Sequence, residues 1–155
     1  MSLIRRILAA GGLILALLTA PTAEATTCSV SAGGIAFGAY NPMGPLPLDS
    51  QGTVSYSCEG TVVASSIWIQ LSAGSGGSFV TRRMAGPADS LVYNLYLDAT
   101  QAIVWGDGTG GSQAYVELLP VGRASKNVPF YGRVLPLQDV AVGSYTDDVA
   151  VTILF

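Results

Sequence analysis

The sequence predicts an all-β domain, an incomplete immunoglobulin-like β-sandwich that lacks its final strand and carries one disulfide. Three observations predict it. Beyond the first 25 residues, apolar side chains recur at every second position through several short segments, as in strands with one buried face. Glycine, proline, serine and aspartate fill the stretches between these segments, and no segment keeps a helical period. Finally, the chain has two cysteines and begins with an export signal.

The first 25 residues have the pattern of a secretory signal peptide. Arg5 and Arg6 precede an apolar run over residues 7–18, and the small-residue triplet at 23–25 is typical of a cleavage site. The apolar run is shorter than the roughly 20 residues that a membrane-spanning helix needs. We therefore expect cleavage after the triplet, which leaves a single β-sandwich domain over residues 26–155.

Eight segments of this domain have the strand pattern. Side chains of a strand alternate between its two faces, so Val54, Tyr56 and Cys58 are expected on one face of their strand. Short antiparallel strands at this spacing are typical of a sandwich. The expected strands cover residues 29–37, 53–58, 66–72, 91–98, 103–105, 114–121, 128–137 and 148–155.

Three stretches between the strands are expected to be connections. Residues 41–48 include three prolines, which have no amide donor for a central strand, so this stretch is expected to be a crossover loop. Residues 73–78 and 106–112 are rich in glycine, for which positive φ angles cost little, and are expected to be turns.

The two cysteines, Cys28 and Cys58, are predicted to form one disulfide, because paired thiols oxidise and persist outside the cytoplasm. Its contribution to stability is expected to be about 3–4 kcal/mol. A metal site is the rival interpretation. It is disfavoured because the chain has no histidine and zinc sites use closely spaced cysteines. We expect no metal and no cofactor.

Charge argues against nucleic acid as a partner. The signal peptide contains two of the 7 basic and one of the 10 acidic residues, so the remaining domain has a net charge of −4. Phosphate binding requires clustered cations. Arg82 and Arg83 are adjacent at the start of a strand, where charges are expected to be solvated and to protect an edge. The basic residues of the domain are scattered: Arg82, Arg83, Arg123, Lys126 and Arg133.

The last strand is the most informative part of the domain. It places Val149, Val151, Ile153 and Phe155 on one face, and the sequence then stops. In a complete sandwich a further strand would pair beside it. We therefore expect an open sheet edge and an apolar groove, with these four residues forming a site that accepts a strand from another protein.

No catalytic residue is expected, and no catalytic substrate. Without histidine there is no Ser-His-Asp or Cys-His arrangement, and the disulfide consumes both thiols. Asp147 and Asp148 are adjacent on a strand and point to opposite faces, which does not suit a glycosidase pair. The stretch 107–111 lacks the alternating acidic ligands of a calcium loop.

Four aromatic residues leave an alternative open. Tyr93, Tyr96, Trp68 and Trp105 would suit a carbohydrate-stacking platform, although core packing is the default for aromatics on alternating strands. The alternative function is thus a free secreted module that binds a carbohydrate or another surface.

A series of short motifs follows one another along the domain, at residues 28–30, 37–40, 54–58, 83–84, 91–98, 105–108, 131–133 and 145–155. In order and spacing these motifs resemble the spore coat protein U domain family, whose members are subunits of archaic chaperone-usher pili. The resemblance covers nearly the whole domain and implies three partners: a periplasmic chaperone that lends a strand, an outer-membrane usher, and a neighbouring subunit that replaces the chaperone strand. It also implies passage through the periplasm to a pilus on the cell surface.

The domain departs from the usual pilus rod subunit at its start. Such subunits carry a donor segment of a dozen or so residues before the first cysteine, whereas here only Thr26 and Thr27 precede it. Two residues span less than about 10 Å. We therefore expect a distal tip or capping subunit with an adhesion role. Met43, Leu46 and Leu48 in the proline-rich loop are the candidate contact residues, unless they fold back onto the end of the sandwich.

Overall fold

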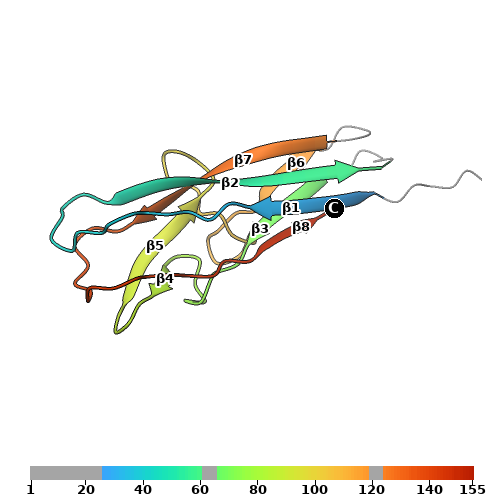
Figure 1. The fold of residues 1–155 in the computed structure, drawn as a ribbon. Helices are drawn as coiled ribbons and strands as arrows, with labels where there is room; N and C mark the ends of the chain where they lie inside the picture. The colour runs from blue at the N-terminus through green and yellow to red at the C-terminus, as the bar shows by residue number, and fades with distance from the viewer. Residues whose placement is uncertain (1–25, 61–65, 119–123) are drawn as a thin grey trace, which may run out of the picture.

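A computed structural model of the chain describes residues 26–60, 66–118 and 124–155, and within them eight β-strands. Figure 1 shows an elongated molecule in which the strands run along the long axis. The strands are β1 (Thr27–Ala32), β2 (Leu48–Glu59), β3 (Ser66–Leu71), β4 (Arg82–Ala85), β5 (Ser90–Tyr96), β6 (Tyr115–Leu118), β7 (Ala124–Val134) and β8 (Val151–Leu154).

The strands form two antiparallel sheets. The first has five strands in the order β1-β2-β7-β5-β4, and the second has three in the order β6-β3-β8. The long β2 and β7 form the centre of the first sheet, with Leu48 opposite Val134 at one end and Cys58 opposite Ala124 at the other. Strand β1 packs beside β8, so these two edges meet along part of one side of the sandwich.

The core lies between the two sheets. Val54, Tyr56 and Cys58 of β2 are buried, as the alternation predicted. Ile67 and Ile69 of β3 face them from the second sheet and are also buried. Trp105 fills the centre, and its ring packs edge to face on Phe130 at a centroid distance of 5.9 Å. The prediction of an all-β sandwich is confirmed.

Cys28 and Cys58 form the predicted disulfide, which is confirmed. The two residues lie directly opposite each other in the β1–β2 ladder, with 4.1 Å between their Cα atoms. Register and covalent bond therefore specify the same pairing, and the disulfide fixes β1 to the edge of the five-stranded sheet.

Several strand boundaries differ from the prediction. Strand β1 ends at Ala32 and not at residue 37, because two consecutive glycines follow and remove the side chains that would pack on the sheet. Strand β2 begins at Leu48, which had been placed in the loop. The expected strand at 103–105 makes isolated bridges only, through Val104 and Trp105. The last strand begins at Val151 and not at Asp148.

Strand β4 was not predicted from the sequence, and the prediction for its first residue was wrong. Arg82 was expected to be solvated, yet it is fully buried. Its Nε and Nη2 atoms donate to the carbonyl of Ser72, Nη2 also donates to the carbonyl of Trp105 at 2.7 Å, and Nη1 donates to Oδ1 of Asn94 at 2.8 Å. The guanidinium is buried because three distant segments supply acceptors, and burial lowers its pKa.

Some predictions lie outside the described residues. These are the signal peptide over residues 1–25, the end of the strand expected at 114–121, and Arg123. Within the part of the chain that is described, no helix has the length and apolar character to cross a membrane.

Candidate functional site

One edge of β8 has no hydrogen-bonded partner in the part of the chain that the structure describes. There β8 makes ladder hydrogen bonds with β3 alone, and its other edge lies beside β1 without pairing to it. Val151 and Ile153 are half-buried and pack against the core, whereas Leu154 is 48% exposed. Unpaired amides and carbonyls next to apolar side chains form a template for another strand.

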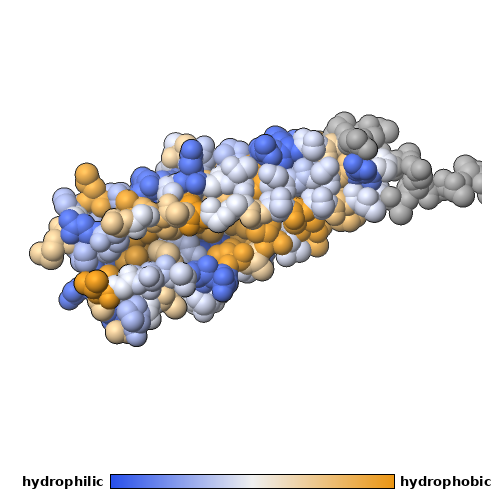
Figure 2. Space-filling view, viewed as in Figure 1, coloured by the Kyte–Doolittle hydropathy of each residue, from blue (hydrophilic) through white to orange (hydrophobic). Residues whose placement is uncertain are grey.

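A groove runs along this side of the molecule. It consists of two adjoining cavities of about 600 Å³ and 290 Å³. One wall is the segment that follows β1, residues 32–40, and the other is the segment that leads into β8, residues 140–151. In Figure 1 these two segments run lengthwise along the same face, and Figure 2 shows a band of hydrophobic residues along that face in the same view.

The floor of the groove is apolar core. Both sheets contribute to it, and its side chains are at most 8% exposed, so the two walls already shield most of the floor from solvent. The larger cavity is lined by Met84, Leu91 and Val134, and the smaller one by Val54, Leu71, Tyr93, Leu95 and Phe130.

The first wall exposes backbone, because most of its residues are small. A Cβ added at Gly34 or Gly38 would meet no atom within 4 Å. Gly33 still donates to the carbonyl of Thr53 at 3.1 Å, and Ser50 Oγ donates to the carbonyl of Ala36 at 2.7 Å. Beyond Gly33 the segment makes no ladder hydrogen bonds in the described part of the chain, although the side chain of Ser50 still holds it beside β2.

The second wall crosses from one sheet to the other. Thr146 exchanges two backbone hydrogen bonds with Ala85 at the end of β4, of 2.7 Å and 3.0 Å. Four residues later, Ala150 accepts from the amide of Ser72 and donates to its hydroxyl, both at 2.9 Å. The second wall is therefore held by hydrogen bonds at both ends, and Asp147 lies between them.

The four residues predicted to form the acceptor site are only partly brought together. Val149 and Val151 line the smaller cavity, and Ile153 packs against the core on the same face. Val149 precedes β8 and is not part of it. The side chain of Phe155 is 57% exposed and does not join the other three.

Most of the residues that form the groove were not predicted from the sequence. Ile35 and Phe37 on the first wall, and Tyr93 and Asp147 across from them, were not assigned to it. One signal was available: two consecutive glycines inside an expected strand are more typical of a break or of close backbone approach.

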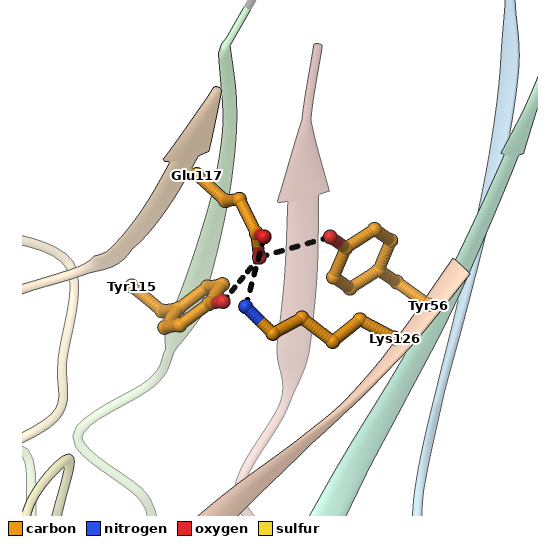
Figure 3. Close-up of polar contacts among 4 residues, drawn as sticks. All are labelled: Tyr56, Tyr115, Glu117 and Lys126. Atoms are coloured by element: carbon orange, nitrogen blue, oxygen red, sulfur yellow. Dashed lines mark hydrogen bonds and ion pairs between the residues drawn. The ribbon is translucent and has the colours of Figure 1, made fainter. Parts of the chain in front are cut away.

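The opposite side of the sandwich is closed by a polar cluster (Figure 3). Glu117 on β6 accepts hydrogen bonds from Tyr56 on β2 at 3.0 Å and from Tyr115, and its other oxygen lies 2.8 Å from Nζ of Lys126 on β7. Burial raises the pKa of Glu117, but the hydrogen bonds from Lys126, Tyr115 and Tyr56 outweigh this and leave it below its ordinary value. Burial and the contact with Glu117 raise the pKa of Tyr56 to about 12.

The three candidate contact residues of the proline-rich loop differ in their exposure. Met43 and Leu46 are 84% and 78% exposed, so they do not fold back onto the sandwich end. Leu48 is the first residue of β2 and packs against the core cluster.

The four aromatics proposed as a sugar platform do not share a surface. Tyr93 and Trp105 are buried in the core, whereas Trp68 is 45% exposed on β3. Within the described ranges, no group of three or more acidic or cysteine side chains could hold a metal ion.

Comparison with known proteins relates the chain to a family, to a curated relative and to solved structures. The Spore Coat Protein U domain model matches residues 14–152. Protein U of Myxococcus xanthus is 34% identical over 143 residues, which cover 83% of this chain and 77% of that protein.

The third similarity is structural. The fold resembles a chain in the crystal structure of the CsuC–CsuE chaperone–tip adhesion subunit pre-assembly complex, from the archaic chaperone-usher Csu pili of Acinetobacter baumannii. The TM-score is 0.55 at 20% sequence identity over 84% of this chain. The match spans 40% of the solved chain, and identity this low relates the two proteins by fold alone.

Proposed function

The chain belongs to the Spore Coat Protein U domain family, and on this premise we propose that it is a structural subunit of an archaic chaperone-usher pilus. Its groove accepts a β-strand from another protein chain, which completes the sandwich. The role is structural and not enzymatic.

The observation that carries this proposal is the groove between the two walls. Its floor is the hydrophobic core, and its sides are the segment after Ala32 and the segment 140–151 that leads into β8. A single added strand has the right shape for such a space, because its apolar side chains fill the floor while its backbone pairs with the walls. Pairing the free backbone of the walls also removes an aggregation hazard.

Three partners follow from this function. A periplasmic chaperone supplies the first strand and keeps the subunit soluble, an outer-membrane usher receives the complex, and a neighbouring subunit donates the strand that replaces the chaperone's. The subunit is exported by the predicted signal peptide and ends at the cell surface. The similarity in fold to a chain from a chaperone–tip adhesion subunit complex supports the first of these partners.

We place the subunit at the distal tip or at a cap. Strand β1 begins at Thr27, so cleavage after residue 25 leaves no segment long enough to donate. In this position the loop that carries Met43 and Leu46 is the adhesive contact, since both side chains are exposed and apolar and the prolines around them limit the entropy lost on binding. N-terminal sequencing of the exported protein tests the cleavage position.

Co-expression tests the proposed function. The mature domain is produced in the periplasm alone or with a candidate chaperone from the same genome. We expect a high yield of soluble, co-purifying complex with the chaperone and a low yield of poorly stable protein without it. A stable, soluble monomer in the absence of any partner would instead favour the free secreted binding module.

A further inference from the structure

Tyr93 on β5 contacts both walls of the groove. Its hydroxyl donates a hydrogen bond of 2.7 Å to Oδ2 of Asp147 on the second wall. Its ring packs edge to face against Phe37 on the first wall, with the ring centroids 5.9 Å apart and an interplanar angle of 69°. The residue is 3% exposed, so it crosses beneath the groove as part of its floor.

The Asp147 end of this link is fixed. Its second oxygen, Oδ1, accepts hydrogen bonds from the amide of Ser75 at 2.8 Å and from the Ser75 hydroxyl at 2.7 Å. Both carboxylate oxygens are therefore engaged, one by the turn after β3 and one by Tyr93. Burial keeps the Tyr93 hydroxyl protonated by raising its pKa, so it remains a donor.

The Phe37 end is also fixed. A Cβ added at Gly132 on β7 would lie 2.7 Å from the Phe37 ring and 2.5 Å from Cδ1 of Ile35. Both side chains thus lie directly on the backbone of β7, where glycine leaves room for them. The first wall is positioned against the floor by these two side chains and held laterally by Tyr93.

The contacts of Tyr93 with the two walls lie where the two cavities meet. Phe37 lines the larger cavity, Tyr93 and Asp147 line the smaller one, and Ile35 lines both. A second link lies toward the far end of the groove, where the Tyr40 hydroxyl donates to the carbonyl of Leu135 at 3.0 Å and accepts from the amide of Gln138 at 2.8 Å. Tyr93 is the link in the interior of the groove.

We propose that Tyr93 is a positioning residue that sets the separation of the two walls, so that the empty subunit already has the width that one added strand needs. The inference rests on the proposed function, because it assigns a role within the strand-accepting groove. A groove held open before binding loses less conformational freedom when the strand enters, which favours fast and tight association.

The test compares two tyrosines with the same chemistry in different places. Tyr93→Phe removes the hydroxyl bonded to Asp147, whereas the control Tyr56→Phe removes the hydroxyl of another buried tyrosine, bonded to Glu117 on the opposite side. The probe is a synthetic peptide of about twelve residues in which valine alternates with threonine. We expect Tyr93→Phe to bind it about tenfold more weakly, mainly through a slower association rate, and Tyr56→Phe to bind it like the parent.

A second measurement reports the distance between the two walls. Nitroxide labels on Ala39→Cys and Ser144→Cys, which are exposed positions on opposite walls, give the distance between the walls by pulsed electron resonance. We expect a narrow distribution in the parent and in Tyr56→Phe, and a broad or shifted one in Tyr93→Phe.

The outcomes separate the two proposals. Equal peptide binding and an unchanged distance distribution in Tyr93→Phe overturn the role of Tyr93 and leave the proposed function standing. Failure of the parent itself to bind the peptide counts against the proposed function. In that case the distance measurement still decides whether Tyr93 sets the separation of the walls.

Discussion

A Cβ placed on Gly74 would lie 2.1 Å from Oδ2 of Asp147, so this carboxylate occupies space that only glycine leaves open. Gly74 also has a φ of +71°, in the left-handed region that other residues avoid. The turn after β3 and the second wall of the groove therefore fit together through a residue that has no side chain.

The first prediction concerns this glycine. Gly74→Ala is expected to cost about 1 kcal/mol for the left-handed backbone and more for displacing Asp147. Gly77→Ala is the matched control, because its φ is +66° and its added Cβ would meet nothing within 4 Å. Urea denaturation of both variants separates the two effects. Equal losses would show that the contact with Asp147 contributes nothing.

The second prediction concerns the buried arginine. Arg82→Lys is expected to lower the free energy of unfolding by about 3 kcal/mol, because an ammonium cannot reach the three acceptors that the planar guanidinium joins. Its neighbour provides the control: Arg83 is exposed and donates to Ser90 Oγ, so Arg83→Lys should change stability by less than about 0.5 kcal/mol. Similar losses in the two variants would contradict the role given to Arg82.

The third prediction is a pH dependence. The pKa of Glu117 is lowered in the folded state, so its contribution is present above the ordinary glutamate pKa and lost as the pH falls through the folded value. Glu117→Gln should therefore be less stable than the parent at pH 7, and the gap should narrow as the pH falls below the ordinary glutamate pKa. Chemical denaturation at several pH values measures it. A gap that stays constant into acid would rule out this linkage.

The fourth prediction concerns the disulfide. Replacing Cys28 and Cys58 together by serine is expected to lower the free energy of unfolding by about 3 kcal/mol, since the bond joins residues 30 positions apart. Because the disulfide fixes β1 to β2, the β1 amides should also exchange hydrogen faster without it. Unchanged stability under oxidising conditions would contradict this contribution.

The fold was largely predictable because the strand period is local. The alternation of Val54, Tyr56 and Cys58 identifies a buried face without knowledge of its partner, and all three residues are buried. Strand ends were harder to place. The ladder of β1 with β2 ends at Ala32, before the two glycines, although hydrogen bonds to Gly33 and Ala36 keep the chain beside β2, and such bonds depend on the rest of the sheet.

The groove was less predictable because its parts come from distant segments. Phe37, Tyr93 and Asp147 meet across the floor of the groove. Taken alone in the sequence, none of these residue types indicates a groove, because each is common elsewhere in a β-sandwich. Arg82 was misread for the same reason: a charged residue suggests solvent unless the carbonyls that bind it are known. A single strand pattern identified only the β8 side of the groove, through Val149 and Val151.

The most direct test of strand acceptance is thermal unfolding of residues 26–155 with and without the alternating valine–threonine peptide. A peptide of the same composition in scrambled order is the control. Binding to the native state alone raises the unfolding temperature by mass action. We predict a rise that grows with the concentration of the alternating peptide and is absent with the scrambled one. An unchanged unfolding temperature at saturating peptide, with the disulfide intact, would contradict the account.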